Sequence, residues 1–512
     1  MVTRFNIAWL SAITVLAGCG GTHATTRPSP STSPVVTRAS LTRMIDSMVN
    51  APEFRTALWG VLIVDPDTRD TLYAHNAPKL FIPASNQKLV SSSVMLERLG
   101  PDFRFRTTFA AHGSIANGTL TGDLAVFGRG DPTMSDRMLK GDAMAAMRAI
   151  ADSLFARGVR RITGNVVAAG DAFPGPVAGA GWPWDGLDGA SFAGVDELLF
   201  NEGLSVLRVR SGSAPGDPAT VETRPTKSFP RVRVLATTVP RDAAPAPGTT
   251  RGGRPGSPTR VSAYHDTVTA EVVVRGQIAI GDSVTITFPQ HDPNSAFLAA
   301  VTEALGERGI TVDHQPTTWS QEQGADSLFT VLSVPLREIM PAIMKPSQNQ
   351  IAEVFLRTLG LEGTGIGTAD SGRRVVERQF ADWNIPSDAF IVRDGSGLSR
   401  NDLISPEAVV GILDVMRRSP NFTVFYESLP IAGVDGTIRT RMRDTPAQGN
   451  LRAKTGTLSM VRSLSGYVRT ANGRLLEFSM LCNNWTTPQS SVDRVQDAIG
   501  AALARLQLEP RR

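Results

Sequence analysis

Residues 83–90 have the sequence Pro83-Ala84-Ser85-Asn86-Gln87-Lys88-Leu89-Val90, which predicts the start of a helix. Apolar residues continue at helical spacing to Leu99, and Gly100 then ends the helix. Residues three apart share a helical face, so Lys88 is expected one turn from Ser85. A serine hydroxyl needs a base within reach to act as a nucleophile, and a lysine with a lowered pKa can be that base. A capped surface helix is the alternative, because roughly one or two Ser-x-x-Lys patterns arise by chance in a chain this long.

Two further patterns follow along the chain, Ser-x-Asn and Lys-Thr-Gly. Ser347-Gln348-Asn349 lies in a predicted helical region, and Lys454-Thr455-Gly456 lies in a predicted strand over residues 451–457. Together with Ser85-x-x-Lys88, the set resembles the three motifs of serine-active penicillin-interacting enzymes. Each pattern is weak alone, whereas three in order, each in the element that it needs, indicate an active site.

The chemistry of acyl transfer gives each motif residue an expected role. Ser85 attacks a carbonyl and Lys88 takes its proton, while the backbone N–H groups of Ser85 and Thr457 stabilise the oxyanion. Ser347 relays a proton to the leaving amine, and Asn349 orients Lys88 and a substrate amide. The remaining residues are expected to bind substrate: Lys454, Thr455 and Thr457 its carboxylate, and Gly456 its backbone by allowing close approach.

Four more segments narrow the resemblance to one family. They are Gly130-Asp131-Pro132-Thr133, Asp394-Gly395-Ser396-Gly397-Leu398-Ser399, Gly433-Val434-Asp435-Gly436-Thr437 and Ala453-Lys454-Thr455-Gly456-Thr457. From about Leu41 to Leu506 the chain resembles the D-alanyl-D-alanine carboxypeptidase/endopeptidases, the low-molecular-mass class C penicillin-binding proteins. The resemblance implies hydrolysis of the terminal D-Ala-D-Ala bond, or of the cross-link between peptidoglycan stem peptides. It implies a serine acyl-enzyme that β-lactams inhibit, with no metal and no cofactor.

The resemblance also implies an α/β (α+β) penicillin-binding/β-lactamase-like transpeptidase fold, an antiparallel sheet flanked by helices. Between the first two motifs the sequence changes to short strands and Gly/Asp turns. We therefore expect a largely β insert over residues 113–292, with the peptidase domain formed by 40–112 and 293–512. Within the insert, Trp182-Pro183-Trp184-Asp185 is predicted to pack as a hydrophobic cluster, with substrate contact as the alternative. Residues 242–260 are expected to form a mobile loop.

The N-terminal sequence predicts an exported lipoprotein. Arg4 precedes a short apolar stretch that is typical of a signal peptide, and Leu16-Ala17-Gly18-Cys19 resembles a bacterial lipobox. We expect a signal peptide over 1–18, a lipidated Cys19 with a disordered tether over 19–39, and a periplasmic enzyme anchored to a membrane. Gly20 in place of an aspartate favours the outer membrane. The other cysteine, Cys482, is expected to be buried in a strand as a small hydrophobe.

The composition argues against several other classes of protein. The chain has 512 residues, 41% hydrophobic and 20% charged, as in ordinary globular proteins. Its net charge of +4 is small, and no basic run is interleaved with aromatic residues, so nucleic-acid binding is not indicated. The six histidines do not show zinc-ligand spacing.

Two rival functions remain open at the level of sequence. A serine β-lactamase or esterase would need a dedicated deacylation base, which we cannot assign. A non-catalytic cell-wall-binding lipoprotein would be favoured by loss of Ser85, Lys88 or Lys454, and all three are present. The sequence does not separate carboxypeptidase from endopeptidase action.

Overall fold

The computed structural model describes residues 36–244, 257–320 and 324–509. The predicted signal peptide and Cys19 lie outside the described residues, as does most of the predicted loop over 242–260. Within the described residues, no helix is long and apolar enough to cross a bilayer. Val36 bridges to Leu506, and Thr37 accepts the Ser40 N–H as the cap of α1 (Arg38–Val49). Residues 36–39 therefore belong to the folded body, and the expectation that the tether reaches residue 39 is wrong.

An antiparallel sheet with the strand order β19-β20-β21-β1-β2 lies at the centre of the peptidase domain. Its strands are β1 (Leu58–Asp65), β2 (Asp70–His75), β19 (Arg452–Leu458), β20 (Val461–Arg469) and β21 (Leu475–Asn483). The first strand lies directly beside the last, since Leu58 pairs with Asn483 and Val64 with Glu477. Cys482 is buried in β21, as predicted.

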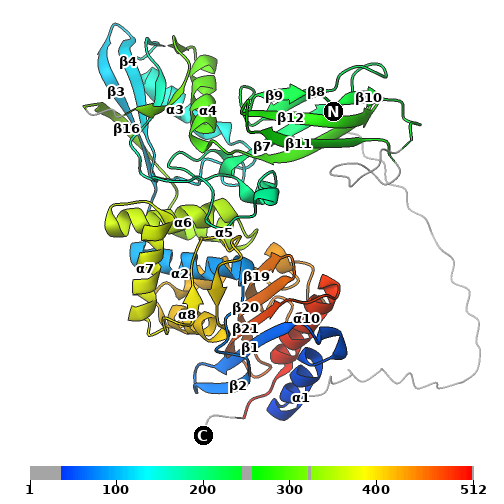
Figure 1. Cartoon of the computed structure of the whole chain (residues 1–512). Helices are drawn as coiled ribbons and strands as arrows, with labels where there is room; N and C mark the ends of the chain where they lie inside the picture. Colours follow the sequence, from blue (N-terminus) through cyan, green and yellow to red (C-terminus); the bar gives the residue numbers. More distant parts are fainter. Residues whose placement is uncertain (1–35, 245–256, 321–323, 510–512) are drawn as a thin grey trace, which may run out of the picture. The chain divides into compact units, whose positions relative to one another are not determined.

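Helices cover both faces of this sheet (Figure 1). On one face, α1 and α10 (Gln489–Arg505) share an apolar core with Trp59, Val61 and Leu464. The other face packs on a larger helical layer through Tyr467 and Leu481. That layer contains α2 (Gln87–Leu99), α5 (Leu336–Met344), α6 (Asn349–Thr364), α7 (Ala369–Asp382), α8 (Pro406–Arg418) and α9 (Phe422–Ser428), beside the short pair β17 (Phe390–Ile391) and β18 (Leu403–Ile404). The predicted sheet flanked by helices is confirmed.

The insert has two sheet assemblies, each with its own core. The first contains β3 (Arg106–Ala116), β4 (Thr119–Phe127), β5 (Arg161–Ile162), β6 (Val166–Ala169), β14 (Thr311–Val312), β15 (Thr317–Ser320) and β16 (Asp326–Leu332), with α3 (Met144–Ala156) and α4 (Pro293–Glu307). The second pairs β7 (Leu204–Arg210), β8 (Thr220–Arg224) and β13 (Ser283–Pro289) in one sheet, and β9 (Val232–Val234), β10 (Thr237–Val239), β11 (Arg260–Asp266) and β12 (Glu271–Ala279) in another. In this second assembly, Leu207 of β7 and Phe288 of β13 pack against Val272 and Val274 of β12.

The expected insert boundaries, 113 and 292, are both wrong. Strand β3 enters the insert at Arg106 and pairs with β16, which leaves it at Leu332. Helix α4 also belongs to the insert, because Phe297 and Val301 share a core with α3. The alternation of residues 103–111 and the periodicity of α4 predict the elements but cannot tell which core they cover. The peptidase domain is accordingly formed by the residues on either side of 106–332.

The close approach of α6 and α7 depends on Gly372. A Cβ at this position would lie 1.8 Å from the backbone oxygen of Leu356 on α6, whereas a Cβ at Gly306 on α4 meets nothing within 4 Å. We predict that Gly372→Ala lowers the free energy of unfolding by at least about 2 kcal/mol, because a backbone atom must move.

The matched control is Gly306→Ala, which should leave stability unchanged or raise it by up to about 1 kcal/mol, since alanine is the better helix former. Chemical denaturation followed by circular dichroism measures both variants. Equal stabilities would contradict the packing argument.

Candidate active site

Ser85 lies in a 3₁₀ turn, Ala84–Asn86, that leads into α2. The side chain of Lys88 donates a hydrogen bond of 3.0 Å to Ser85 Oγ, as the spacing predicts. Ser85 is only partly buried, whereas Lys88 is completely buried. The hydroxyl therefore faces an open cavity while the amine behind it is withdrawn from water.

Lys88 has three partners from three distant parts of the chain. Besides Ser85, its Nζ donates 2.7 Å bonds to Asn349 Oδ1 and to the backbone oxygen of Ser396. Burial lowers the pKa of Lys88 to about 7, against the opposing effect of nearby carboxylates, those of Asp394, Glu353 and Asp402. A substantial share of the amine is consequently unprotonated at neutral pH, as a base requires.

A buried carboxylate pair holds the loop that contacts Lys88. Asp394 accepts hydrogen bonds from the N–H groups of Ser396, Gly397 and Ser399. Glu353 accepts from Gly395 and Ser396, and burial together with the charge of Asp394 raises the pKa of Glu353 to about 7. These bonds fix the Ser396 carbonyl at the position where Lys88 donates to it.

The second motif meets the third across the cavity. Lys454 donates 2.8 Å bonds to Ser347 Oγ and to the backbone oxygen of Thr455. Burial, and then the positive charges of Lys88 and Arg462, hold the pKa of Lys454 well below its ordinary value. Ser347 has φ +65°, a left-handed conformation directly before α6. The turn thus brings Ser347 to Lys454 while Asn349, in the first turn of α6, reaches Lys88.

Gly456 is required by the protein's own packing. A Cβ there would lie 2.5 Å from the backbone oxygen of Pro83 and 2.9 Å from the backbone nitrogen of Ser85. The two segments are joined by a bond from Asn86 Nδ2 to the Lys454 oxygen at 2.9 Å, and by one from Ser463 Oγ to the Pro83 oxygen at 2.7 Å. The glycine expected to admit substrate therefore first lets β19 lie against the turn that carries Ser85.

The motif residues line a cavity of about 220 Å³. Its lining comprises Ser85, Ser191, Ser347, Asn349, Leu398, Thr437, Thr455, Thr457 and Leu458. Thr455 Oγ1 donates to Thr437 Oγ1 at 2.7 Å, and the Thr457 hydroxyl contacts the Arg462 guanidinium. The structure thus brings together all the predicted motif residues, with Lys454 behind Ser347 and Lys88 behind Ser85.

The insert contributes to this site through Ser191, which the sequence did not single out, and through Trp182, which it did. The backbone oxygen of Ser191 accepts a 3.0 Å bond from Asn349 Nδ2 and lines the cavity. Trp182 Nε1 donates to Asp394 Oδ2 at 3.0 Å, while Trp184 is 85% exposed. The prediction of a packed cluster at 182–185 is therefore wrong for Trp184, and Trp182 is held by a carboxylate.

The D-Ala-D-Ala carboxypeptidase 3 (S13) family matches residues 41–506. The chain belongs to this family. The match covers the whole segment over which the resemblance was inferred, and it includes the insert as well as the three motifs. The fold and family expected from the sequence are therefore both confirmed.

Known S13-like proteins agree in sequence and in fold. The chain is 32% identical over 498 residues to a D-alanyl-D-alanine carboxypeptidase of Actinomadura sp. (strain R39), covering 92% of this chain and 87% of that protein. It is 25% identical to the D-alanyl-D-alanine carboxypeptidase DacB of Haemophilus influenzae, over 81% of this chain and 82% of that one. The crystal structure of penicillin binding protein 4 from H. influenzae superposes with a TM-score of 0.76 at 23% identity, covering 90% of this chain and 99% of that chain.

The lowered pKa of Lys88 leads to a prediction of how the acylation rate depends on pH. Only the neutral amine accepts a proton, so acylation of Ser85 by a β-lactam should accelerate as pH rises through about 7 and level off above it. Below that pH the second-order rate constant should fall about tenfold per pH unit. Stopped-flow acylation between pH 5 and 9 measures the profile.

A variant of Glu353 tests what sets the midpoint of this pH profile of acylation. Glu353→Gln removes a charge that raises the pKa of Lys88 but keeps an acceptor for Gly395 and Ser396, so the midpoint should move to lower pH. Glu362→Gln, at the far end of α6, should leave it in place. A profile that is flat from pH 5 to 8 would exclude Lys88 as the base.

Proposed function

We propose that this S13 protein is a serine D-Ala-D-Ala carboxypeptidase and D,D-endopeptidase that hydrolyses peptidoglycan stem peptides through an acyl-enzyme on Ser85. The observation that carries the proposal is the buried Lys88 amine, 3.0 Å from Ser85 Oγ, with its pKa lowered to about 7. A nucleophile paired with a base of matched pKa is the requirement for acyl transfer at neutral pH. The named activities of the relatives support the choice of substrate.

In the acylation step, neutral Lys88 takes the proton of Ser85 as Oγ attacks the penultimate D-alanine carbonyl. The oxyanion is stabilised by the backbone N–H groups of Ser85 and Thr457, the latter on the edge strand β19. Collapse breaks the C–N bond, and the proton that Lys88 took from Ser85 passes to the leaving amine through Ser347, which is hydrogen-bonded to Lys454. Water then attacks the ester and gives a proton to the neutral Lys88, which returns it to Ser85 Oγ as the ester C–O bond breaks.

The terminal carboxylate of the substrate fits the end of the cavity formed by β19. Thr455 and Thr437 offer hydroxyls there, and Thr457 lies against the Arg462 guanidinium. Behind these hydroxyls lie Lys454, hydrogen-bonded to Ser347, and the Arg462 guanidinium. Asn349 is held at both ends of its amide, by Lys88 and by the Ser191 oxygen, so it presents a fixed edge to a substrate amide. β-Lactams, which combine an amide and a carboxylate, fit the same groups.

We further propose that the protein is a periplasmic lipoprotein anchored through Cys19, with the outer membrane as its location. This proposal rests on Leu16-Ala17-Gly18-Cys19 and on Gly20. The described part of the chain begins at Val36, 17 residues after Cys19.

Labelling by penicillin tests the nucleophile and the base separately. Wild-type protein should gain one drug mass on the peptide containing Ser85 and release D-alanine from acyl-D-Ala-D-Ala. Ser85→Ala should abolish both, and Lys88→Arg should reduce both at least about a thousandfold, because a guanidinium stays protonated. Ser47→Ala and Lys79→Arg, at exposed positions, are the matched controls.

Mass spectrometry of the intact protein and of its peptides decides between the outcomes. Labelling of Ser85→Ala at the wild-type rate would assign the nucleophile to another residue. Rapid turnover of penicillin without release of D-alanine from the peptide would instead make the protein a β-lactamase.

The anchor is tested by Cys19→Ser. The variant should lose its lipid and partition into the aqueous phase of a detergent separation, while its labelling by penicillin stays as in the wild type. A stable membrane anchor takes more than one acyl chain. Wild-type protein that carries such an anchor should partition quantitatively into the detergent phase. Wild-type protein in the aqueous phase would show that the lipobox interpretation is wrong.

A further inference from the structure

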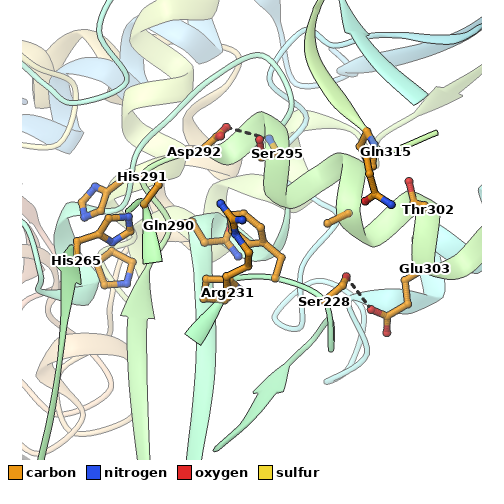
Figure 2. A pocket seen from close by; sticks show the side chains of 16 residues that line it. Ser228, Arg231, His265, Gln290, His291, Asp292, Ser295, Thr302, Glu303 and Gln315 are labelled. Carbon is orange, nitrogen blue, oxygen red and sulfur yellow. Dashed lines mark hydrogen bonds between the residues drawn. The ribbon is translucent and has the colours of Figure 1, made fainter. Parts of the chain in front are cut away.

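A second cavity, of about 780 Å³, lies within the insert and is larger than the one at Ser85. It is bounded by α4, by the ends of β11 and β13, and by the segments 228–231 and 315–316 (Figure 2). Small-molecule sites commonly measure about 300–1,000 Å³. No step of the proposed hydrolysis uses this cavity.

Its walls contain buried polar atoms without partners. Gln290 Oε1, His265 Nδ1 and Thr302 Oγ1 make no hydrogen bond within the described part of the chain. Gln290 is 3% exposed, and its amide is fixed because Nε2 donates to Ser205 Oγ at 2.9 Å. Most buried polar groups in proteins are hydrogen-bonded, so three unpaired atoms in residues that line one cavity mark its wall as polar.

The charges around the cavity are mixed. Among the described residues the Arg231 guanidinium has no ion pair or hydrogen bond, and Figure 2 places it between the two ends of the cavity. Asp292 Oδ1 accepts the Ser295 N–H at 2.9 Å, and Glu303 Oε2 accepts the Lys227 N–H at 2.9 Å, which leaves the second oxygen of each carboxylate for a ligand. Two carboxylates against one arginine disfavour a phosphate-rich ligand.

Flat aromatic rings form the other kind of wall. His265 stacks on Phe288 at 5.6 Å, and His291 meets His265 edge-to-face at 4.5 Å. Burial lowers the pKa of both histidines, so they are neutral at neutral pH. Phe229 and Pro316 add apolar surface. A ligand of this cavity therefore needs apolar faces and groups that both donate and accept hydrogen bonds.

We propose that this cavity binds a short saccharide, a segment of the glycan strand that carries the stem peptides. Sugar rings present apolar C–H faces to aromatic rings, and their hydroxyl and acetamido groups match the Arg231 guanidinium and the free carboxylate oxygens of Asp292 and Glu303. The choice of ligand rests on the proposed function, since peptidoglycan joins the peptide and the saccharide in one polymer.

One loop connects the cavity with the active site. The His291 ring is hydrogen-bonded to the backbone of Leu187, and the backbone N–H of His265 donates to Asp188 Oδ1 at 3.0 Å. A few residues further on, the Ser191 oxygen accepts from Asn349 and lines the cavity at Ser85. A glycan held at the insert would thereby raise the local concentration of its stem peptides near Ser85.

Filling the cavity provides the test. Ala299, on α4, lines it, and Ala299→Phe should block it without removing a polar group. Glu307→Phe, exposed at the end of the same helix, is the control. Calorimetric titration with a peptide-free tetrasaccharide from peptidoglycan should show binding by the wild type and the control, and at least about tenfold weaker binding by Ala299→Phe.

Each readout separates this site from the active site. Digestion of intact sacculi should slow in Ala299→Phe, whereas acylation of Ser85 by penicillin and release of D-alanine from a short peptide should not. No binding by wild type at millimolar tetrasaccharide, or equal binding by Ala299→Phe, would overturn the proposal. Binding that persists in a wild-type protein that fails to hydrolyse D-Ala-D-Ala would refute the proposed function and leave the saccharide site standing.

Discussion

The arrangement of this enzyme depends on burying the side-chain amine of Lys88 away from water. Removing a lysine from water costs several kcal/mol unless it is hydrogen-bonded, and Lys88 has three acceptors, from Ser85, Asn349 and Ser396. Those acceptors belong to the 3₁₀ turn before α2, to α6 and to the loop before β18. The catalytic pKa is therefore a property of how three distant segments pack. Glu353 and Asp394 hold the loop, and they also supply the negative charge that keeps the amine from losing its proton altogether.

The insert is tied into this arrangement by contacts at the site. Trp182 donates to Asp394, and Asn349 donates to the Ser191 oxygen, so two groups that position Lys88 are themselves positioned from the insert. Arg357 on α6 reaches the Pro176 oxygen with a further bond. An insert attached only as a spacer would not need to satisfy polar groups of the catalytic centre. Substitutions in it can thus influence chemistry without touching substrate.

The sequence predicts the parts of the site that are local and misses those that arise from packing. Ser85 and Lys88 are one helical turn apart, and Lys454 to Thr457 lie in one predicted strand, so pattern alone places them. Glu353 has only its spacing of four residues from Asn349 as a signal, which ordinary helices share. Ser191 acts through its backbone oxygen. Because every residue has one, the residue type gives no signal. The limits of the insert fail for a related reason, since Phe109 and Phe297 are apolar in whichever core they join.

The pairing of β1 with β21 also governs how the protein is made. Leu58 finds its partner at Asn483, almost the whole length of the folded chain away, and β19 and β20 complete the sheet from the same C-terminal region. During synthesis, β1 emerges early and keeps one edge unpaired until the last strands arrive. The insert closes its sheets within itself and can fold meanwhile. The turn that carries Ser85 therefore remains without β19, which packs against it, until the C-terminal region is complete, so a chain cut short before β19 lacks an intact site.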